Sequence, residues 1–465
     1  MDIALPYGWK PRGYQMRAWR HFQDTPRARG VLLWHRRSGK DLLSLNLCGV
    51  KAHERIGTYW HVFPTYRQGK EIIWNGATKE GRKFLDFFPQ ELIDHKHETD
   101  LRITFRNGSN YRIVGSDNFD SLVGTNPIGV IMSEYSLQDP AAWDYIRPIL
   151  SENDGWALFN YTARGRNHGF DLYQMALNNP RWFCEKLVAG SGPECTKRED
   201  GSPVVSDETI DEERRAGMSE EMINQEYKNS FDAPMSGAYY SAQIDALERR
   251  GQITTVPHDP NLQVDTYWDI GMRDSTTIWF IQQHRDTFRV IDYYEMSGEP
   301  LAHYVKIIRG QREGHEHRMD YTYRYHFAPH DIQVTEYTTG TSRIEAARKL
   351  GLKFRVVPMH EVLDGIEAVR SILSSCWFDH QRTDKGLKAL RSYHKKYNDK
   401  MRIFHDDPQH DWSSHAADSF RMFAMSTKVL QRSYADRPKQ TIALDDYDYL
   451  NGRNKRTIDS RYAGA

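Results

Sequence analysis

The feature that most constrains the fold is an alternation of short apolar runs with longer segments of helical pattern. Before residue 190 the strand-like apolar runs fall at residues 31–34, 57–63, 102–105, 128–134 and 156–162. Strands that are separated by helices usually form a mainly parallel sheet with helices on both faces. An Asn107-Gly108 turn after the third run predicts one hairpin within this pattern. The first part of the chain is therefore predicted to be an α/β domain.

The alternation stops in a polar stretch and then begins again, which predicts two domains. The first covers residues 1–190, and residues 191–255 are charged and rich in turn formers, as in a linker with a small helical piece. A second α/β pattern covers residues 256–430. Residues 431–465 are polar without apolar periodicity, which is typical of a mobile tail. The total of 465 residues also exceeds what one core usually serves.

The composition argues against several classes of protein. No stretch approaches the roughly 20 apolar residues of a membrane helix, and the N-terminus lacks the apolar core of a signal peptide, so a cytoplasmic location is expected. The four cysteines form no C-x-x-C pair, which argues against a zinc knuckle or a disulfide framework. A formal net charge of zero argues against tight passive binding of nucleic acid, but it allows local contacts with phosphates that are made and released.

A candidate phosphate loop lies between the first apolar run and a helical segment. Its Gly39-Lys40 pair resembles the end of the pattern G-x-x-x-x-G-K-[ST]. Backbone N–H groups at a helix N-terminus would cradle phosphates, and Lys40 would neutralise the β- and γ-phosphates. Trp34 replaces the first glycine and Asp41 replaces Ser or Thr. Taken alone, this segment is better explained by a chance Gly-Lys pair after a strand.

The apolar run at residues 128–134 strengthens the nucleotide interpretation, because it ends in an acidic residue. In nucleotide-driven motors such a strand ends in two acidic residues; the first helps to hold Mg²⁺ and the second orients the attacking water. Glu134 fits the second role, whereas Ser133 is a weaker metal ligand than an aspartate. The Asp41 carboxylate could restore the metal contact, directly or through water.

Two more polar positions stand where such a motor needs them. Thr162 ends the next apolar run, where its hydroxyl could sense the γ-phosphate or simply cap the strand. Upstream, Gln15 could read the adenine edge while Tyr14 stacks on the ring, or Gln15 could face solvent. The order of the four elements along the chain, more than any one of them, predicts an ATPase.

Three acidic residues in the second half predict a different kind of site. Asp269 and Asp331 each follow an apolar run, and Asp418 lies in a helical segment among apolar neighbours. Carboxylates from two strand ends and a helix can hold two divalent ions about 4 Å apart, which activate water and stabilise the leaving oxygen of a phosphodiester. Oxygen ligands favour Mg²⁺ or Mn²⁺. Candidates for supporting these ligands are Asp274, His330, Asp411 and His415.

Each of the three acids also has a simpler explanation. Asp269 could be a turn residue, and Asp331 could cap the segment that follows it. Asp418 could pair with Arg421 three residues later on a helix surface. The histidines 405, 410 and 415 could suggest zinc, but their spacing of five matches no common zinc pattern.

With both sites in view, the chain resembles the large terminase subunit of tailed bacteriophages, from Tyr14-Gln15 to Asp418. The segment HRRSGK looks like the arginine-bearing phosphate loop of that family, VIMSE like its acidic strand, and TARG like its coupling motif. WDIG, PHDI and SSHAADSFR look like its three nuclease motifs, and the last is the most specific match. The resemblance implies a P-loop (RecA/ASCE-like) ATPase domain followed by an RNase H-like nuclease domain.

The resemblance also implies a role for each site residue. Nucleotide binding would involve Gln15, Arg36, Arg37, Ser38, Gly39, Lys40, Asp41 and Thr162. Glu134 would be catalytic, and either Arg36 or Arg37 would assist cleavage at the γ-phosphate. The nuclease metals would be held by Asp269, Asp331 and Asp418. The enzyme would thus be an ATPase and a metal-dependent DNA endonuclease with ATP and Mg²⁺, or Mn²⁺ at the nuclease site, as cofactors.

Family membership would further imply partners and a location. These are double-stranded DNA, a small terminase subunit and a portal protein, with a ring of five copies during packaging. The place would be the cytoplasm of the infected host, with transient docking on the procapsid. A helicase-nuclease of repair or restriction is the main alternative, but the roughly 70 residues between the two sites are few for the second motor lobe it needs. A structural head component with a decayed ATPase fold is the other alternative.

Overall fold

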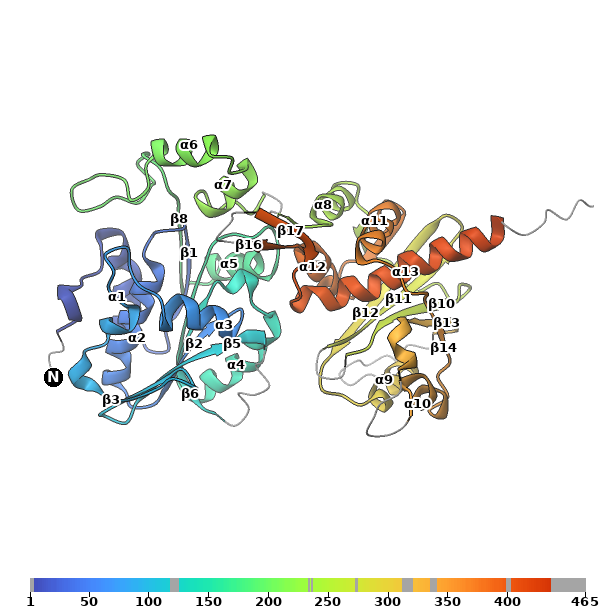
Figure 1. Cartoon of the computed structure of the whole chain (residues 1–465), viewed down its shortest axis with the longest axis horizontal. Coiled ribbons are helices and arrows are strands. Elements are labelled where there is room, and N and C mark those ends of the chain that lie inside the picture. The colour runs from blue at the N-terminus through green and yellow to red at the C-terminus, as the bar shows by residue number, and fades with distance from the viewer. Residues whose placement is uncertain are drawn as a thin grey trace, which may run out of the picture.

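The computed structural model describes residues 4–117, 125–232, 235, 237–271, 275–311, 321–334, 341–398 and 403–435. The chain forms two α/β lobes that lie side by side, each built around its own large sheet (Figure 1). Most of the predicted tail lies outside the described residues, and its first five residues continue the last helix, α13 (Trp412–Ala435). No helix in the described part of the chain is long and apolar enough to cross a membrane.

The N-terminal lobe contains an eight-stranded sheet in the order β3-β4-β5-β2-β6-β7-β1-β8. The six strands from β5 to β8 in this order run parallel, and β4 pairs antiparallel with β3 and β5, which confirms the predicted hairpin. The strands are β1 Arg29–Trp34, β2 Thr58–Phe63, β3 Ile93–His97, β4 Arg102–Phe105, β5 Asn110–Gly115, β6 Pro127–Ser133, β7 Trp156–Tyr161 and β8 Trp182–Leu187. This mainly parallel sheet confirms the predicted α/β class of the first domain.

Helices cover both faces of this sheet, and two apolar cores result. One core joins α1 and α2 to the strands, and the other joins α4 and α5 to them. The helices are α1 Met16–Asp24, α2 Lys40–Glu54, α3 Tyr66–Gly69, α4 Pro140–Glu152 and α5 His168–Leu177. Because β6 and β7 are buried along their whole length, their sequences are mostly apolar, with the polar Ser133 and Asn160 only near their carboxyl ends. The carboxyl ends of β1, β6 and β7 meet at one edge, where the phosphate loop begins.

The segment between the predicted domains contributes to both lobes. Helices α6 (Asp207–Arg215) and α7 (Glu220–Glu226) share a small apolar cluster that includes Ala189, next to the end of β8. Helix α8 (Ser241–Arg249) instead buries Ile244 in the core of the C-terminal lobe. Figure 1 shows α6 and α7 above the first lobe and α8 beside α11.

The C-terminal lobe contains a seven-stranded sheet in the order β14-β13-β10-β11-β12-β15-β9. Strands β10, β11 and β12 form an antiparallel meander, and β13 and β14 extend it in parallel beside β10. The strands are β9 Ile253–Thr254, β10 Val264–Asp269, β11 Thr276–His284, β12 Thr287–Met296, β13 Tyr323–Ala328, β14 Phe354–Val356 and β15 Cys376–Asp379. The arrangement confirms the predicted α/β class of the second domain.

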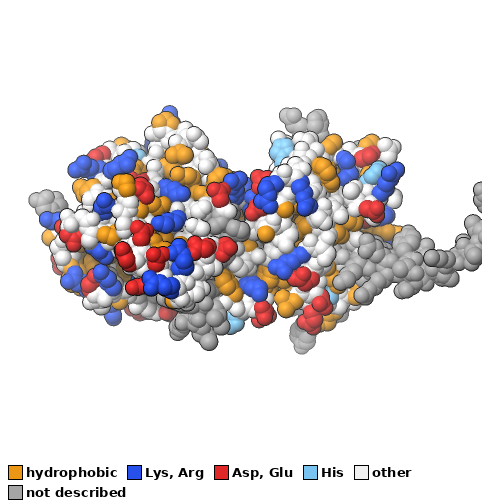
Figure 2. Space-filling view, turned by 90° about the horizontal axis from the view of Figure 1, so that it is seen from above, with side chains coloured by type: hydrophobic (Ala, Val, Ile, Leu, Met, Phe, Trp, Pro, Cys, Tyr) orange, Lys and Arg blue, Asp and Glu red, His pale blue; other side chains and the backbone are white. Residues whose placement is uncertain are grey.

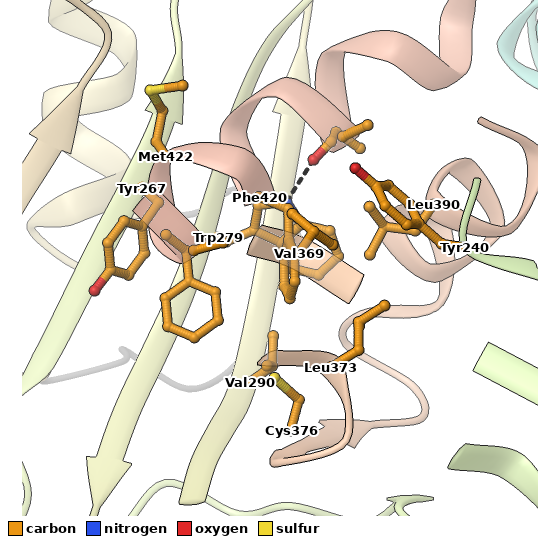
Figure 3. Packing of buried hydrophobic residues seen from close by; sticks show 14 of the residues in the cluster. Tyr240, Tyr267, Trp279, Val290, Val369, Leu373, Cys376, Leu390, Phe420 and Met422 are labelled. Atoms are coloured by element: carbon orange, nitrogen blue, oxygen red, sulfur yellow. Dashed lines mark hydrogen bonds between the residues drawn. The ribbon is translucent and has the colours of Figure 1, made fainter. Parts of the chain in front are cut away.

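Helix α13 packs across the meander and is held there by a large aromatic core. Phe420 of α13 contacts Trp279 of β11, with ring centroids 5.1 Å apart, and the Trp279 indole N–H donates to the Ala416 carbonyl at 2.9 Å (Figure 3). The other helices are α9 Leu301–Ile308, α10 Arg343–Lys349, α11 Val362–Leu373 and α12 Asp384–Ser392, and a small hairpin joins β16 Lys395–Asn398 to β17 Ile403–Pro408. This packing fixes which side chains of α13 face the end of β10.

Acidic and basic side chains are mixed over the surface. On the face seen in Figure 2, Lys and Arg side chains are interspersed with Asp and Glu over both lobes. The pattern agrees with the formal net charge of zero. A functional site is therefore expected where charged side chains form a local cluster.

Candidate functional sites

The loop that the sequence predicted to bind phosphate, called the phosphate loop below, connects β1 to α2. Trp34 is the last residue of β1, and Lys40 is the first residue of α2. Gly39 precedes the helix in a left-handed conformation with φ of +77°, which favours glycine. The first turn of α2 directs its N–H groups and the positive end of its dipole toward the loop. This geometry suits an anion such as a phosphate.

Lys40 and Glu134 form an ion pair at the edge of the sheet, with 3.1 Å between Nζ and Oε1. The lysine side chain is buried, at 7% exposure, and its ammonium also donates to the Trp34 carbonyl at 3.4 Å. Glu134 follows β6 with φ of 54°, and its N–H donates to the Asn160 carbonyl at 2.7 Å. Its Oε2 is buried and has no hydrogen-bond partner among the described residues. The structure thus brings together the cation and the carboxylate that the sequence predicted.

Asp41, in the first turn of α2, supplies a second carboxylate in the region of the Lys40–Glu134 ion pair. Burial raises the pKa of Asp41 to about 6; Lys40 opposes this rise and Glu134 adds to it. Ser133 is fully buried, and its hydroxyl lies 2.7 Å from Nε2 of His61. Burial lowers the pKa of His61 to about 3, so that this histidine is neutral. Ser133 is therefore engaged inside the sheet, whereas Asp41 stands beside the ion pair.

Tyr14 and Gln15 form hydrogen bonds with the backbone of the phosphate loop. The Tyr14 hydroxyl donates to the Ser38 carbonyl at 2.7 Å, and Nε2 of Gln15 donates to the same oxygen at 3.1 Å. Oε1 of Gln15 accepts the N–H of Arg12 at 3.0 Å. Because Gln15 is only 2% exposed, the solvent-facing alternative is wrong. Recognition of adenine by these two residues stays a prediction.

Thr162 and the two loop arginines have different surroundings. Thr162 follows β7, is buried, and carries an Oγ1 without a hydrogen-bond partner in the described part of the chain. Arg37 is exposed and has a left-handed backbone with φ of 72°. Nη1 of Arg36 lies 3.9 Å from the carboxylate of Glu226, which comes from α7. Sequence reasoning missed Glu226, because it lies in a polar segment without a recognisable motif.

The second site gathers two of the three predicted acids. Asp269 ends β10, and its carboxylate lies 3.5 Å from Nδ1 of His415 on α13. One turn further, Asp418 pairs with Arg421 at 3.0 Å. Burial raises the pKa of Asp418 to about 6; Arg421 opposes this rise and Asp269 adds to it. The Asp418–Arg421 ion pair that the sequence suggested is therefore present. The Asp418 carboxylate is nevertheless partly buried and is influenced by the charge of Asp269.

Asp331 lies at the same edge of the sheet as Asp269, but it is not grouped with Asp269 and Asp418. It lies in the short 3₁₀ turn His330–Gln333 after β13, and β13 runs parallel to β10 with Phe327 opposite Tyr267. Its side chain is exposed. Within the described ranges, no three His, Cys, Asp or Glu side chains are grouped closely enough to hold a metal ion. Asp274 lies outside the described residues. The three-carboxylate metal site therefore stays a prediction.

Comparisons with known proteins cover both lobes. No protein-family model matches the chain. The large terminase subunit of Escherichia phage T5 is 23% identical over 436 residues, which cover 90% of this chain and 91% of that protein. That of Thermus virus P23-45 is 22% identical and covers 84% and 86%. Among solved structures, the large terminase of a thermophilic bacteriophage in complex with ADP aligns with 89% of this chain and 98% of its own, at 15% identity and a TM-score of 0.39.

Proposed function

We propose that this chain is a large terminase subunit of a phage, as its similarity to two such subunits suggests, and that it hydrolyses ATP in its N-terminal lobe to drive DNA into a procapsid and cuts that DNA with its C-terminal lobe. The observation that carries the proposal is that each lobe gathers its own charged cluster at the carboxyl edge of its sheet. One cluster contains Lys40 and Glu134, and the other contains Asp269 and Asp418. The first suits a triphosphate, and the second suits a divalent cation.

In the N-terminal lobe, the start of α2 and Lys40 would bind the phosphates, and Glu134 would orient the water that attacks the γ-phosphate. Mg²⁺ fits this site, because Asp41 and Glu134 supply two carboxylates against one ammonium. Asp41 is the better ligand candidate, since the Ser133 hydroxyl is engaged with His61. When bound, Mg²⁺ would neutralise charge on the phosphates.

In the C-terminal lobe, Asp269 and Asp418 would hold Mg²⁺ or Mn²⁺, and Asp331 would join them from the neighbouring strand. The donors are oxygens, which suit these hard cations. His415 would orient the Asp269 carboxylate. The ions would supply an activated water and would stabilise the leaving oxygen of the phosphodiester.

The substrate and partners follow from the family. The proposed substrate of both lobes is double-stranded DNA, and the proposed partners are a small terminase subunit and a portal protein. A ring of five copies would act during packaging, in the cytoplasm of the infected host and docked on the procapsid. A helicase-nuclease would instead separate strands, so the full-length chain should fail to unwind a fluorescent duplex while it hydrolyses ATP.

Separation of the two activities tests the proposal. Lys40→Ala should abolish ATP hydrolysis and leave plasmid cutting in Mn²⁺ intact, because the two sites lie in different lobes. Asp269→Ala should lower plasmid cutting by about a hundredfold or more and leave phosphate release unchanged. Both variants are measured in both assays, with thermal melting as the control for folding. Wild-type cutting by Asp269→Ala, or wild-type turnover by Lys40→Ala, would contradict the assignment.

A further inference from the structure

We propose that Glu226, on helix α7, is a positioning residue that holds Arg36 and Arg164 in place at the ATP site. The inference rests on the proposed ATPase activity and extends it to a residue outside the phosphate loop. Glu226 lies in none of the predicted motifs, and Arg164 lies in TARG, where only Thr162 was predicted to bind nucleotide. The carboxylate reaches the site from the segment between the two predicted domains.

Glu226 is placed between two guanidinium groups. Its Oε1 lies 2.6 Å from Nη2 of Arg164, and its Oε2 lies 3.9 Å from Nη1 of Arg36. Each carboxylate oxygen thus faces a different arginine. The backbone takes part as well, since the N–H of Arg36 donates to the Glu226 carbonyl at 2.8 Å. The side chains of Glu226 and Arg164 are 5% and 16% exposed, so solvent cannot readily replace this pair, whereas the Arg36 side chain is half exposed.

The charges around Glu226 keep its carboxylate ionised. Burial alone would raise its pKa, but Arg164, Arg36 and Lys40 act against burial, and the net shift of the pKa is downward. A buried carboxylate is tolerated when it is paired and hydrogen-bonded. Glu226 is therefore an anion held between two arginines, Arg164 and Arg36.

The segment that follows α7 ties this anion to the sheet. The Asn229 side chain donates to the carbonyls of Leu33 at 3.1 Å and Leu187 at 2.8 Å. Its Oδ1 accepts the N–H of Ala163, the residue between Thr162 and Arg164, at 3.3 Å. The segment thus contacts the ends of β1 and β8 and the residues after β7. These contacts restrict movement of Glu226 relative to the loop.

The two arginines occupy positions that matter for cleavage of a γ-phosphate. Arg36 lies in the phosphate loop, and Arg164 lies two residues after Thr162, whose hydroxyl has no hydrogen-bond partner among the described residues. Guanidinium groups at a γ-phosphate stabilise charge in the transition state, provided that they are held in place beforehand. Without Glu226, two long cationic side chains would repel each other and lose their fixed positions. Turnover should then fall, whereas binding of a polyanion should not weaken.

Kinetics of Glu226→Gln test the inference. We expect kcat for ATP hydrolysis to fall by about tenfold or more, with KM unchanged or lower, because a negative charge near the phosphates is removed. Glu226→Asp keeps the charge at a shorter reach and should recover part of the lost kcat. Glu221→Gln is the matched control, since Glu221 is exposed on the same helix and should leave kcat and KM unchanged.

A double-mutant cycle with Arg164→Gln separates positioning from general damage. If Glu226 acts through Arg164, adding Glu226→Gln to Arg164→Gln should lower kcat by no more than about twofold beyond Arg164→Gln alone. Wild-type kcat in Glu226→Gln, or fully multiplicative effects of the two changes, would overturn the inference. If thermal melting shows that Glu226→Gln does not fold, kcat and KM are measured for Glu226→Asp instead, and a lower kcat with an unchanged KM is the expected result. A wild-type chain that hydrolyses no ATP would instead refute the ATPase proposal itself.

Discussion

Replacement of Glu134 by glutamine isolates the chemical role of one carboxylate. Glutamine keeps the length of the side chain and can accept a hydrogen bond from Lys40, which lies 3.1 Å away in the wild type. It also leaves the left-handed backbone, φ of 54°, and the N–H bond to Asn160 unchanged. The partly buried Lys40–Glu134 charge pair is lost, which should cost about 1–3 kcal/mol of unfolding free energy. The variant should therefore still fold.

The effect on hydrolysis should be much larger than the effect on stability. A positioned general base or water-orienting group contributes about 10²–10⁴-fold to a rate, and each factor of ten corresponds to about 1.4 kcal/mol. We therefore expect kcat of Glu134→Gln to fall by at least about a hundredfold. Binding of ATP should be retained or tightened, because Lys40 loses its carboxylate partner and one negative charge leaves the site.

Two measurements distinguish these effects. Phosphate release at saturating ATP gives kcat, and titration with a fluorescent ATP analogue gives Kd. Glu152→Gln serves as the control, because Glu152 is exposed at the end of α4. A kcat for Glu134→Gln within about threefold of wild type would refute the assignment of Glu134, whereas a lost affinity would show that the residue serves binding instead.

Other substitutions test the geometry of both sites. Gly39→Ala should destabilise the chain by about 1 kcal/mol and weaken ATP binding, because φ is +77° and the added Cβ would lie 3.1 Å from Nε2 of Gln15; chemical denaturation and ATP titration measure this. Asp331→Ala and Asp418→Ala should each lower plasmid nicking in Mn²⁺ by about a hundredfold, and the double variant should be no worse, if the two acids share one metal cluster. Asp139→Asn should stabilise the chain by about 1–3 kcal/mol near pH 7.5 but not near pH 4, as urea unfolding can show. Burial raises the pKa of Asp139 to about 6, above that of the unfolded chain, so the wild type loses stability as pH rises between these values and the asparagine does not.

The sequence predicted that Lys40 and the carboxylate of Glu134 would share one site, because both residues stand just after strand ends. Strands β1 and β6 are buried on both faces, so their apolar runs stop where the chain leaves the sheet, at Trp34 and at Ser133. Parallel strands end at the same edge, which is why Lys40 and Glu134 meet although β7 lies between their strands. Local pattern and sheet geometry were sufficient for this pair.

Pairings that depend on tertiary structure could not be predicted in the same way. Arg164 and Glu226 are far apart in the chain, and 63 Asp and Glu residues were available as partners for any arginine. Strand β9 has only two residues, too few for a periodic pattern, yet it extends the second sheet and brings α8 with it. Ser133 shows the same dependence, since its bond to His61 of β2 is fixed by the order of the strands.

Contacts between the lobes bear on how cutting should be measured. Lys388 of α12 pairs with Asp171 of α5 at 2.5 Å, and the ring of His168, also on α5, contacts Trp412 at a centroid distance of 5.4 Å. Trp412 begins α13, the helix that carries His415 and Asp418. Lys388 and Trp412 thus place the start of this helix against α5 of the first lobe. Removal of the N-terminal lobe would change the surroundings of this helix, and cutting by the acidic-site variants therefore has to be compared in the full chain.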